Sequence, residues 1–93
     1  MIKSYRNTDL ENFWTRGDEI KSVPTELTRW VELALDLLDA AVKPEDTFIP
    51  GLPGYIYEED DKERFGIVVA IGWRLSYEWE DDNAINIDLE RVI

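Results

Sequence analysis

The sequence has 93 residues and a net charge of −11, and it contains neither cysteine nor histidine. These absences exclude disulfides, thiolate metal sites, thiol nucleophiles and acid–base catalysis by imidazole. Hydrophobic residues make up 44% of the chain, which is enough for the core of one small domain spanning residues 1–93. No signal peptide or membrane-spanning apolar run is evident, so we expect a cytoplasmic protein.

The negative charge is concentrated in the second half of the chain. Residues 1–23 contain four bases and four acids, whereas residues 44–64 contain two bases and seven acids. An acidic surface repels nucleic acid and attracts basic partners. The simpler interpretation, that excess acid only improves solubility, stays open at this point.

The N-terminal part of the chain predicts one short helix. Residues 1–5 form an expected extended start. The motif TDLE at Thr8–Glu11 has the spacing of a capping box with Thr8 at the N-cap. The helix that it begins should end near Gly17, and residues 18–23 should form a polar connector.

The stretch from Pro24 to Val42 predicts a longer amphipathic helix, which Lys43 and Pro44 end. Glycines and prolines then predict an irregular segment at 50–54. The helix needs a sheet or another helix to cover its apolar stripe. That stripe consists of Leu27, Trp30, Val31, Ala34, Leu38 and Ala41, widened by Leu35 and Leu37.

From Tyr55 onward the apolar residues alternate with a period of two, which predicts strands with one buried face. The inward sets are Phe65, Ile67, Val69 and Ile71, then Trp73, Leu75, Tyr77 and Trp79, then Ile85, Ile87 and Leu89. Short turns at 71–72 and 80–83 predict an antiparallel meander. We therefore expect a two-layer α+β domain with two N-terminal helices packed on an antiparallel β-sheet.

The two acidic runs, at 57–64 and 78–83, lack the spacing of a calcium-binding loop, so we expect a solvated hairpin arm and a turn there. No metal or other cofactor is expected. Nothing singles out a catalytic pair of carboxylates, and a serine nucleophile would have no histidine base. The sequence contains no glycine-rich phosphate loop.

Several motifs occur in a recognisable order. The chain begins with MIKSYRN, continues with LDLLDAA followed by PED, and ends with GWRLSYEWED followed by Ala84. In this order and from end to end, the chain resembles the HigB branch of the RelE/ParE toxin superfamily, the ribosome-dependent mRNA interferases of bacterial toxin–antitoxin pairs. The resemblance implies a RelE/HigB-like fold.

The active-site positions that the resemblance implies are mostly changed. The family has basic residues in its RNA groove and an aromatic or histidine near the C-terminus. Here Glu58, Val68 and Glu78 stand where cations are expected. Val92 and Ile93 replace the closing tyrosine and histidine. Arg74 is retained, and we interpret it as the salt-bridge partner of a neighbouring acid such as Glu78.

The leading hypothesis is a catalytically inactive HigB/RelE-like protein that acts as an acidic protein-binding module. It could mimic nucleic acid and inhibit a defence machine, as phage anti-defence or anti-CRISPR proteins do, or sequester an antitoxin, or join a larger complex. The expected partner is a basic or nucleic-acid-binding protein, or a HigA-like antitoxin, with no direct contact to nucleic acid or membrane. The expected contacts are Glu58, Glu59, Asp60, Asp61, Glu78, Glu80, Asp81 and Asp82.

The alternative is a ribosome-dependent mRNA interferase of the HigB type with a HigA-like antitoxin. In that case Arg74 would be a catalytic residue, because cations stabilise the charge that develops at the scissile phosphate. An enzyme with a small-molecule substrate is a third possibility.

Overall fold

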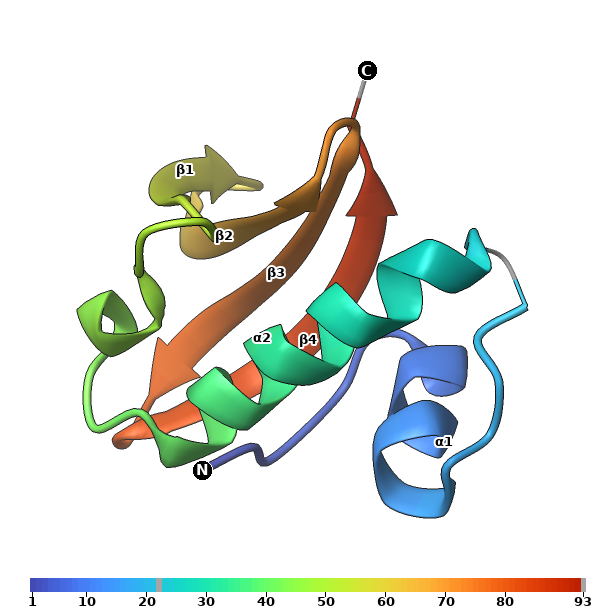
Figure 1. Cartoon of the computed structure of the whole chain (residues 1–93). Helices are drawn as coiled ribbons and strands as arrows, with labels where there is room; N and C mark the ends of the chain where they lie inside the picture. Colours follow the sequence, from blue (N-terminus) through green and yellow to red (C-terminus); the bar gives the residue numbers. More distant parts are fainter. Residues whose placement is uncertain (22, 93) are drawn as a thin grey trace.

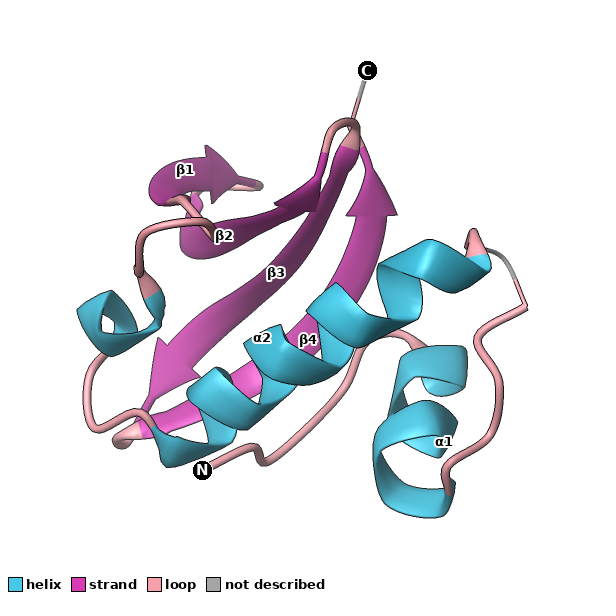
Figure 2. Ribbon diagram, in the orientation of Figure 1, coloured by secondary structure: helices cyan, strands magenta, loops and turns pink. Residues whose placement is uncertain are grey.

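A four-stranded antiparallel sheet and two α-helices make up the fold of residues 1–21 and 23–92, the part of the chain that the computed structural model describes (Figure 1). The α-helices are α1 (Thr8–Arg16) and α2 (Thr28–Ala40), and the strands are β1 (Gly54–Glu59), β2 (Lys62–Ala70), β3 (Trp73–Glu80) and β4 (Asn83–Arg91). Short 3-10 helices, η1 (Thr25–Leu27) and η2 (Pro44–Thr47), flank α2. The strand order β1-β2-β3-β4 confirms the expected meander (Figure 2).

The core lies between α2 and one face of the sheet (Figure 1). Fully buried side chains come from both elements: Val31, Ala34, Leu35 and Leu38 from α2, and Ile67, Leu75, Tyr77 and Ile87 from the strands. Trp73 and Trp79 are partly buried and pack against this cluster, so the predicted inward face of β3 is confirmed. Burial of each large apolar side chain stabilises the fold by about 1.5–3 kcal/mol.

The Tyr77 hydroxyl joins η2 to the sheet. It lies 2.9 Å from the Thr47 hydroxyl and donates to the Pro44 carbonyl at 3.2 Å. Burial raises the pKa of Tyr77 to about 12, although the hydrogen bond with Thr47 opposes the shift. The phenol therefore stays neutral, and its buried hydroxyl finds partners in the Thr47 hydroxyl and the Pro44 carbonyl, which also bond to each other at 2.8 Å.

The N-terminal segment is extended, as expected, and runs parallel to β4. Ile2 pairs with Ala84, and Tyr5 pairs with Ile87. The Lys3 N–H donates to the Ala84 carbonyl at 2.9 Å. This pairing covers the outer edge of β4, which would otherwise present unpaired backbone groups.

Helix α1 ends where the sequence predicts but is capped one residue earlier. Its N-cap is Asn7, whose side-chain oxygen accepts from the Leu10 N–H at 3.0 Å, so the prediction of Thr8 as N-cap is wrong. Asparagine caps as well as threonine does, and Thr8 already lies within the first turn. The C-cap is Gly17, with a φ of 77° that favours glycine.

Three predicted core residues point elsewhere. Trp30 is 43% exposed because α2 turns a different side toward the sheet. Ile71 is fully exposed because β2 ends at Ala70, after an irregularity in its pairing with β3. Ile85 pairs with Glu78 across a bulge near Asn86, so Ala84 takes the inward position before Ile87 instead.

Both acidic hairpin turns have a left-handed backbone. Asp60 and Asp61 have φ values of 54° and 63°, and Asp81 and Asp82 have values of 51° and 64°. Two consecutive positive φ values are typical of the type I′ turns that connect tightly paired strands. The expected turn-forming role of the second acidic run is therefore confirmed. Aspartate tolerates this conformation less well than glycine does.

No helix in the described ranges is long and apolar enough to cross a membrane.

Glycine at the second turn position should stabilise the protein. We expect Asp61→Gly and Asp82→Gly each to raise the free energy of unfolding by about 0.5–1 kcal/mol, because glycine relieves the cost of positive φ. Urea denaturation measures the change.

Asp61→Asn and Asp82→Asn are the matched controls, because they remove the same charge without the freedom of glycine. A gain as large with asparagine as with glycine would mean that charge repulsion, not backbone conformation, limits stability at these turns.

Candidate functional site

The sheet face opposite α2 carries a polar cluster, which we call the arginine cluster. It consists of Arg6, Arg64 and Arg74, the carboxylates of Glu59, Glu78, Asp88 and Glu90, and the hydroxyls of Tyr55, Tyr57 and Ser76. The strand residues occupy alternate positions, and on β2, β3 and β4 the residues between them face the core, which places the cluster side chains on the other side of the sheet. Functional groups from the N-terminal segment, β1, β2, β3 and β4 thus meet on one surface.

Arg64 lies at the bottom of this cluster with its side chain only 1% exposed. Its guanidinium donates to the Glu78 carboxylate at 2.7 Å, to the Ser76 hydroxyl at 3.0 Å and to the Asn86 carbonyl at 2.9 Å. A buried charge needs such compensation, because desolvation of an unpaired guanidinium is costly. Arg64 therefore ties β2 to both β3 and β4.

Arg74 is more accessible than Arg64, with 17% of its side chain exposed. Its guanidinium donates to the Tyr55 hydroxyl at 3.0 Å and to Glu90 at 3.3 Å, and it lies 4.0 Å from the centre of the Tyr57 ring. Gly66 leaves room for Tyr55, because a Cβ there would lie 3.0 Å from the tyrosine Cζ. Two phenols and one carboxylate therefore orient this guanidinium.

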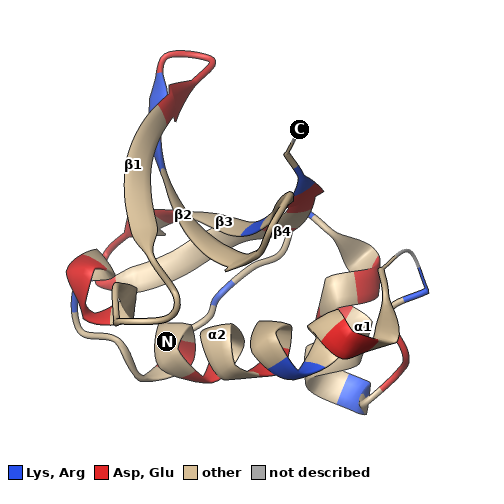
Figure 3. Ribbon diagram, turned by 45° about the horizontal axis from the view of Figure 1, so that its top comes forward, with Lys and Arg blue, Asp and Glu red and all other residues tan. Residues whose placement is uncertain are grey.

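Arg6 reaches the cluster from the N-terminal segment. It donates to Glu59 at 2.8 Å and to Asp88 at 3.0 Å, so it connects β1 with β4. The hydrogen bond to Glu59 raises the pKa of Arg6, and Asp88 adds to the shift against the effect of burial. The β1–β2 hairpin curves out of the plane of the sheet (Figure 3), and Arg6 contacts it through Glu59 at the end of β1.

Glu90 is the carboxylate with the most cluster contacts. It accepts from the Ser76 hydroxyl at 2.5 Å and from Arg74, and its Oε2 lies 3.7 Å from Arg6. Burial alone would raise the pKa of Glu90, but the Ser76 hydrogen bond and the two arginines together lower it. Glu90 is therefore an anion at neutral pH.

The expected salt bridge of Arg74 with a neighbouring acid is confirmed, but the acid is Glu90, its cross-strand partner on β4, and Glu78 as the example was wrong. Glu78 pairs with Arg64 instead. The sequence reasoning missed Arg64 and Arg6 as members of the site. The position of Arg64 was predictable from the sequence. Phe65 and Ile67 are expected to face the core, so residue 64 is expected on the opposite face of the strand. Only the fold could reveal Arg6, which lies far from the strands in sequence.

The expected acidic binding residues fall into two groups. Glu59 and Glu78 both approach Arg64 and are partly buried within the arginine cluster. The other six are exposed at or beside the two hairpin turns: Glu58, Asp60, Asp61, Glu80, Asp81 and Asp82. The acidic tip of the β1–β2 hairpin stands clear of the rest of the chain (Figure 3). Val92 is exposed at the end of β4, and Ile93 lies outside the described residues.

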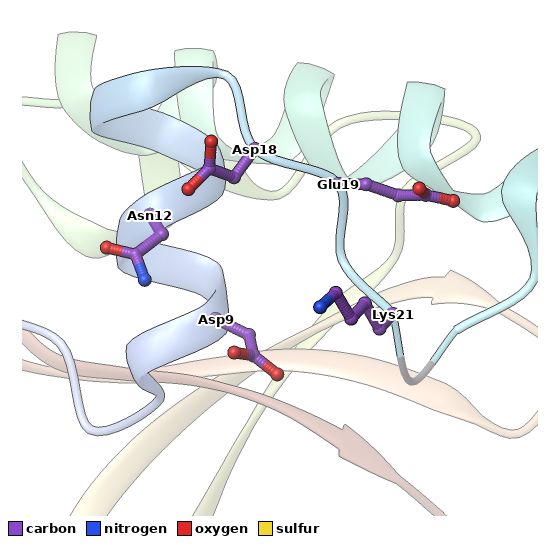
Figure 4. A pocket seen from close by; sticks show the side chains of 5 residues that line it. All are labelled: Asp9, Asn12, Asp18, Glu19 and Lys21. Carbon is purple, nitrogen blue, oxygen red and sulfur yellow. The ribbon is translucent and has the colours of Figure 1, made fainter.

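A separate acidic hollow lies between α1 and the loop that follows it (Figure 4). Asp9, Asn12, Asp18, Glu19 and Lys21 line it. The Glu19 side chain points away from those of Asp9 and Asp18, so the three carboxylates do not converge (Figure 4). No group of three metal-ligating side chains is placed to hold an ion within residues 1–21 and 23–92.

The stability contributed by Glu90 should depend on pH. Because its pKa is lower in the folded chain than in the unfolded chain, this contribution is complete above about pH 5 and is lost as the pH falls through the folded-state pKa. We expect Glu90→Gln to lower the free energy of unfolding by about 1–3 kcal/mol near neutral pH. Urea denaturation at neutral and acidic pH measures the difference.

Glu80→Gln is the control, because Glu80 is exposed and forms no ion pair within the described chain. It should change stability by less than about 0.5 kcal/mol at either pH. An effect of Glu90→Gln that is equally large in acid would rule out a role for the carboxylate charge.

Comparison with known families gives a match over nearly the whole chain. Residues 3–91 match a family model described as the RelE-like toxin of the type II toxin–antitoxin system HigB. No curated protein sequence matches the chain. The resemblance identified from the sequence motifs is thereby confirmed, and the chain belongs to the HigB-like toxin family.

Proposed function

We propose that this two-layer α+β protein is the toxin of a type II pair, that it cleaves mRNA on the ribosome in the cytosol, and that a HigA-like antitoxin is its partner. The family match favours this alternative over the hypothesis of an inactive inhibitor. The observation that supports catalysis is the group around Arg74, where a partly exposed guanidinium, two phenol hydroxyls and the Glu90 carboxylate lie together.

These groups suit the cleavage of RNA by its own 2′-hydroxyl. The reaction needs a base for the 2′-hydroxyl proton, a cation for the phosphate oxygens and a proton donor for the leaving 5′-oxygen. We assign the base to Glu90, which is ionised at neutral pH, and the phosphate contact to Arg74. Tyr55 or Tyr57 is the proton donor, since both hydroxyls lie within the cluster.

The charge of the protein supports dependence on the ribosome. A chain of net charge −11 repels free RNA, and the ion pair with Glu90 neutralises the charge of Arg74. When the ribosome holds the mRNA beside the toxin, the effective concentration of RNA at the cluster is high. The repulsion that slows the encounter with free RNA then matters less. The inversion of groove charge expected from Val68 and Glu78 stays a prediction: three arginines lie on this face, together with four carboxylates that pair with them.

Loss of the Arg74 guanidinium should abolish cleavage. We expect Arg74→Ala to cleave mRNA at least about 100-fold more slowly than wild type, because removal of one donor to a developing oxyanion costs that much. Primer extension on mRNA in a reconstituted translation system measures the rate.

Arg29→Ala is the matched control, because Arg29 is exposed on α2 and lies outside the arginine cluster. It should cleave as wild type does. Absence of ribosome-dependent cleavage by the wild-type protein would instead favour the inactive binding module.

We also propose that the exposed acids at the hairpin turns steer a basic partner by long-range attraction. Six exposed carboxylates lie at or beside these turns, and none of them forms an ion pair within the described chain. Steering of this kind raises association rates and weakens as salt screens the charges.

The triple variant Glu58→Lys, Asp60→Lys and Asp81→Lys should slow association with the antitoxin by about tenfold at low salt. Stopped-flow mixing over a salt series measures the rate. Glu78 is left unchanged because its reversal would disrupt the ion pair with Arg64. Association that is independent of salt and of the three substitutions would mean that the acids serve solubility alone.

A further inference from the structure

An apolar groove lies between the start of α2 and the β2–β3 turn, outside the arginine cluster. It has a volume of about 280 Å³ and is lined by Pro24, Glu26, Leu27, Trp30, Ala70, Ile71 and Trp73. A second hollow along α2 shares Trp30 with it and adds the exposed Leu33. The two hollows form a continuous strip of exposed apolar surface, whose centre is Trp30.

Neither Ile71 nor Trp30 belongs to the core cluster, so packing of the core does not require an apolar side chain at either position. Ile71 is fully exposed in a tight turn, a position where polar residues are usual, and the φ of 82° at Gly72 shapes that turn. Trp30 is 43% exposed in the first turn of α2, beside the β2–β3 turn. Exposed apolar residues are common singly, but a contiguous strip marks a surface that is covered in a complex.

Acidic side chains surround the strip. Glu26 lines the groove, and Glu32 and Asp36 line the adjoining hollow, where Arg29 is the one base among the lining residues. A second copy of this chain would bring its own acids and its net charge of −11 against them. Charge therefore favours a basic protein segment.

The secondary structure of the occupant follows from the walls of the groove. β2 reaches the groove only with Ala70, its last residue, and β3 only with Trp73, its first residue, so the walls offer no length of strand edge for an added strand. Apolar anchors lie instead on both sides of a cleft, from α2 on one side and the β2–β3 turn on the other. A helix laid into such a groove inserts apolar side chains at three- and four-residue spacing.

We propose that this groove docks a basic amphipathic helix of the partner protein, with its apolar stripe against Trp30 and Ile71 and its lysines or arginines against Glu26, Glu32 and Asp36. The assignment of that helix to the antitoxin rests on the proposed function. The docking chemistry does not rest on it, because it follows from the apolar groove and its acidic rim.

The probe is a synthetic helical peptide with a leucine stripe flanked by lysines, compared with a peptide that has glutamates in place of the lysines. Calorimetric titration of the whole chain should show binding of the lysine peptide at least tenfold tighter than that of the glutamate peptide. Amide chemical shifts should change at Trp30 and Ile71.

Ile71→Asp should weaken the lysine peptide at least tenfold and leave the fold intact, because Ile71 has no part in the core. Ile56→Asp is the matched control: Ile56 is exposed on β1, away from the groove, and its substitution should leave binding unchanged. Equal binding of both peptides, or equal loss in both variants, would overturn the proposal.

Sedimentation of the chain alone distinguishes a partner helix from a second copy of the chain as the occupant of the groove. We expect a monomer, and a dimer that Ile71→Asp dissociates would show that the occupant is a second copy. Ile71→Asp should also cleave mRNA as wild type does, because the groove lies outside the arginine cluster. Absence of cleavage by both proteins would refute the proposed function and leave the docking result standing.

Discussion

The burial of the Arg64 guanidinium is the constraint on which the polar half of the structure depends. Its charge is withdrawn from water, so the surrounding strands must supply acceptors in fixed positions. β3 supplies Glu78 and Ser76, and β4 supplies the Asn86 carbonyl. The bulge at Asn86, where φ is 51°, gives that carbonyl its position, and the Ser4 hydroxyl accepts from the Asn86 N–H at 2.9 Å. One cation therefore fixes the register of β4 and the place of the N-terminal segment.

The sequence predicts the regular parts of the fold and misses the parts where regularity breaks. Alternation in β3 identifies Leu75 and Tyr77 as core residues, because nothing interrupts the pleat between them. The same rule fails for Ile85, since a bulge reverses the phase of β4, and for Ile71, since the strand has already ended. Bulges and strand ends depend on pairing between strands, which periodicity within one strand does not reveal.

The site shows the same division. Arg74 is identified from its motif, but its partner Glu90 depends on the register that the bulge sets. Counting lost cations position by position suggests a groove without positive charge. The structure brings Arg64 and Arg6 to the face that carries Arg74, from positions that a motif comparison does not align. The Arg64 side chain is only 1% exposed, so a cation can lie on this face without being accessible to a ligand.

The parallel pairing of the N-terminal segment with β4 has a consequence for folding during translation. Arg6 and Asn7 hydrogen-bond to Asp88, so the cluster joins residues that are 82 and 81 positions apart. Contacts of such long sequence separation close late in folding, because a long loop must be ordered first. During translation, Arg6 emerges long before the strand that holds it. A ribosome therefore cannot carry a finished arginine cluster on the nascent chain until β4 has been made, which delays assembly of the site until nearly the whole described chain exists.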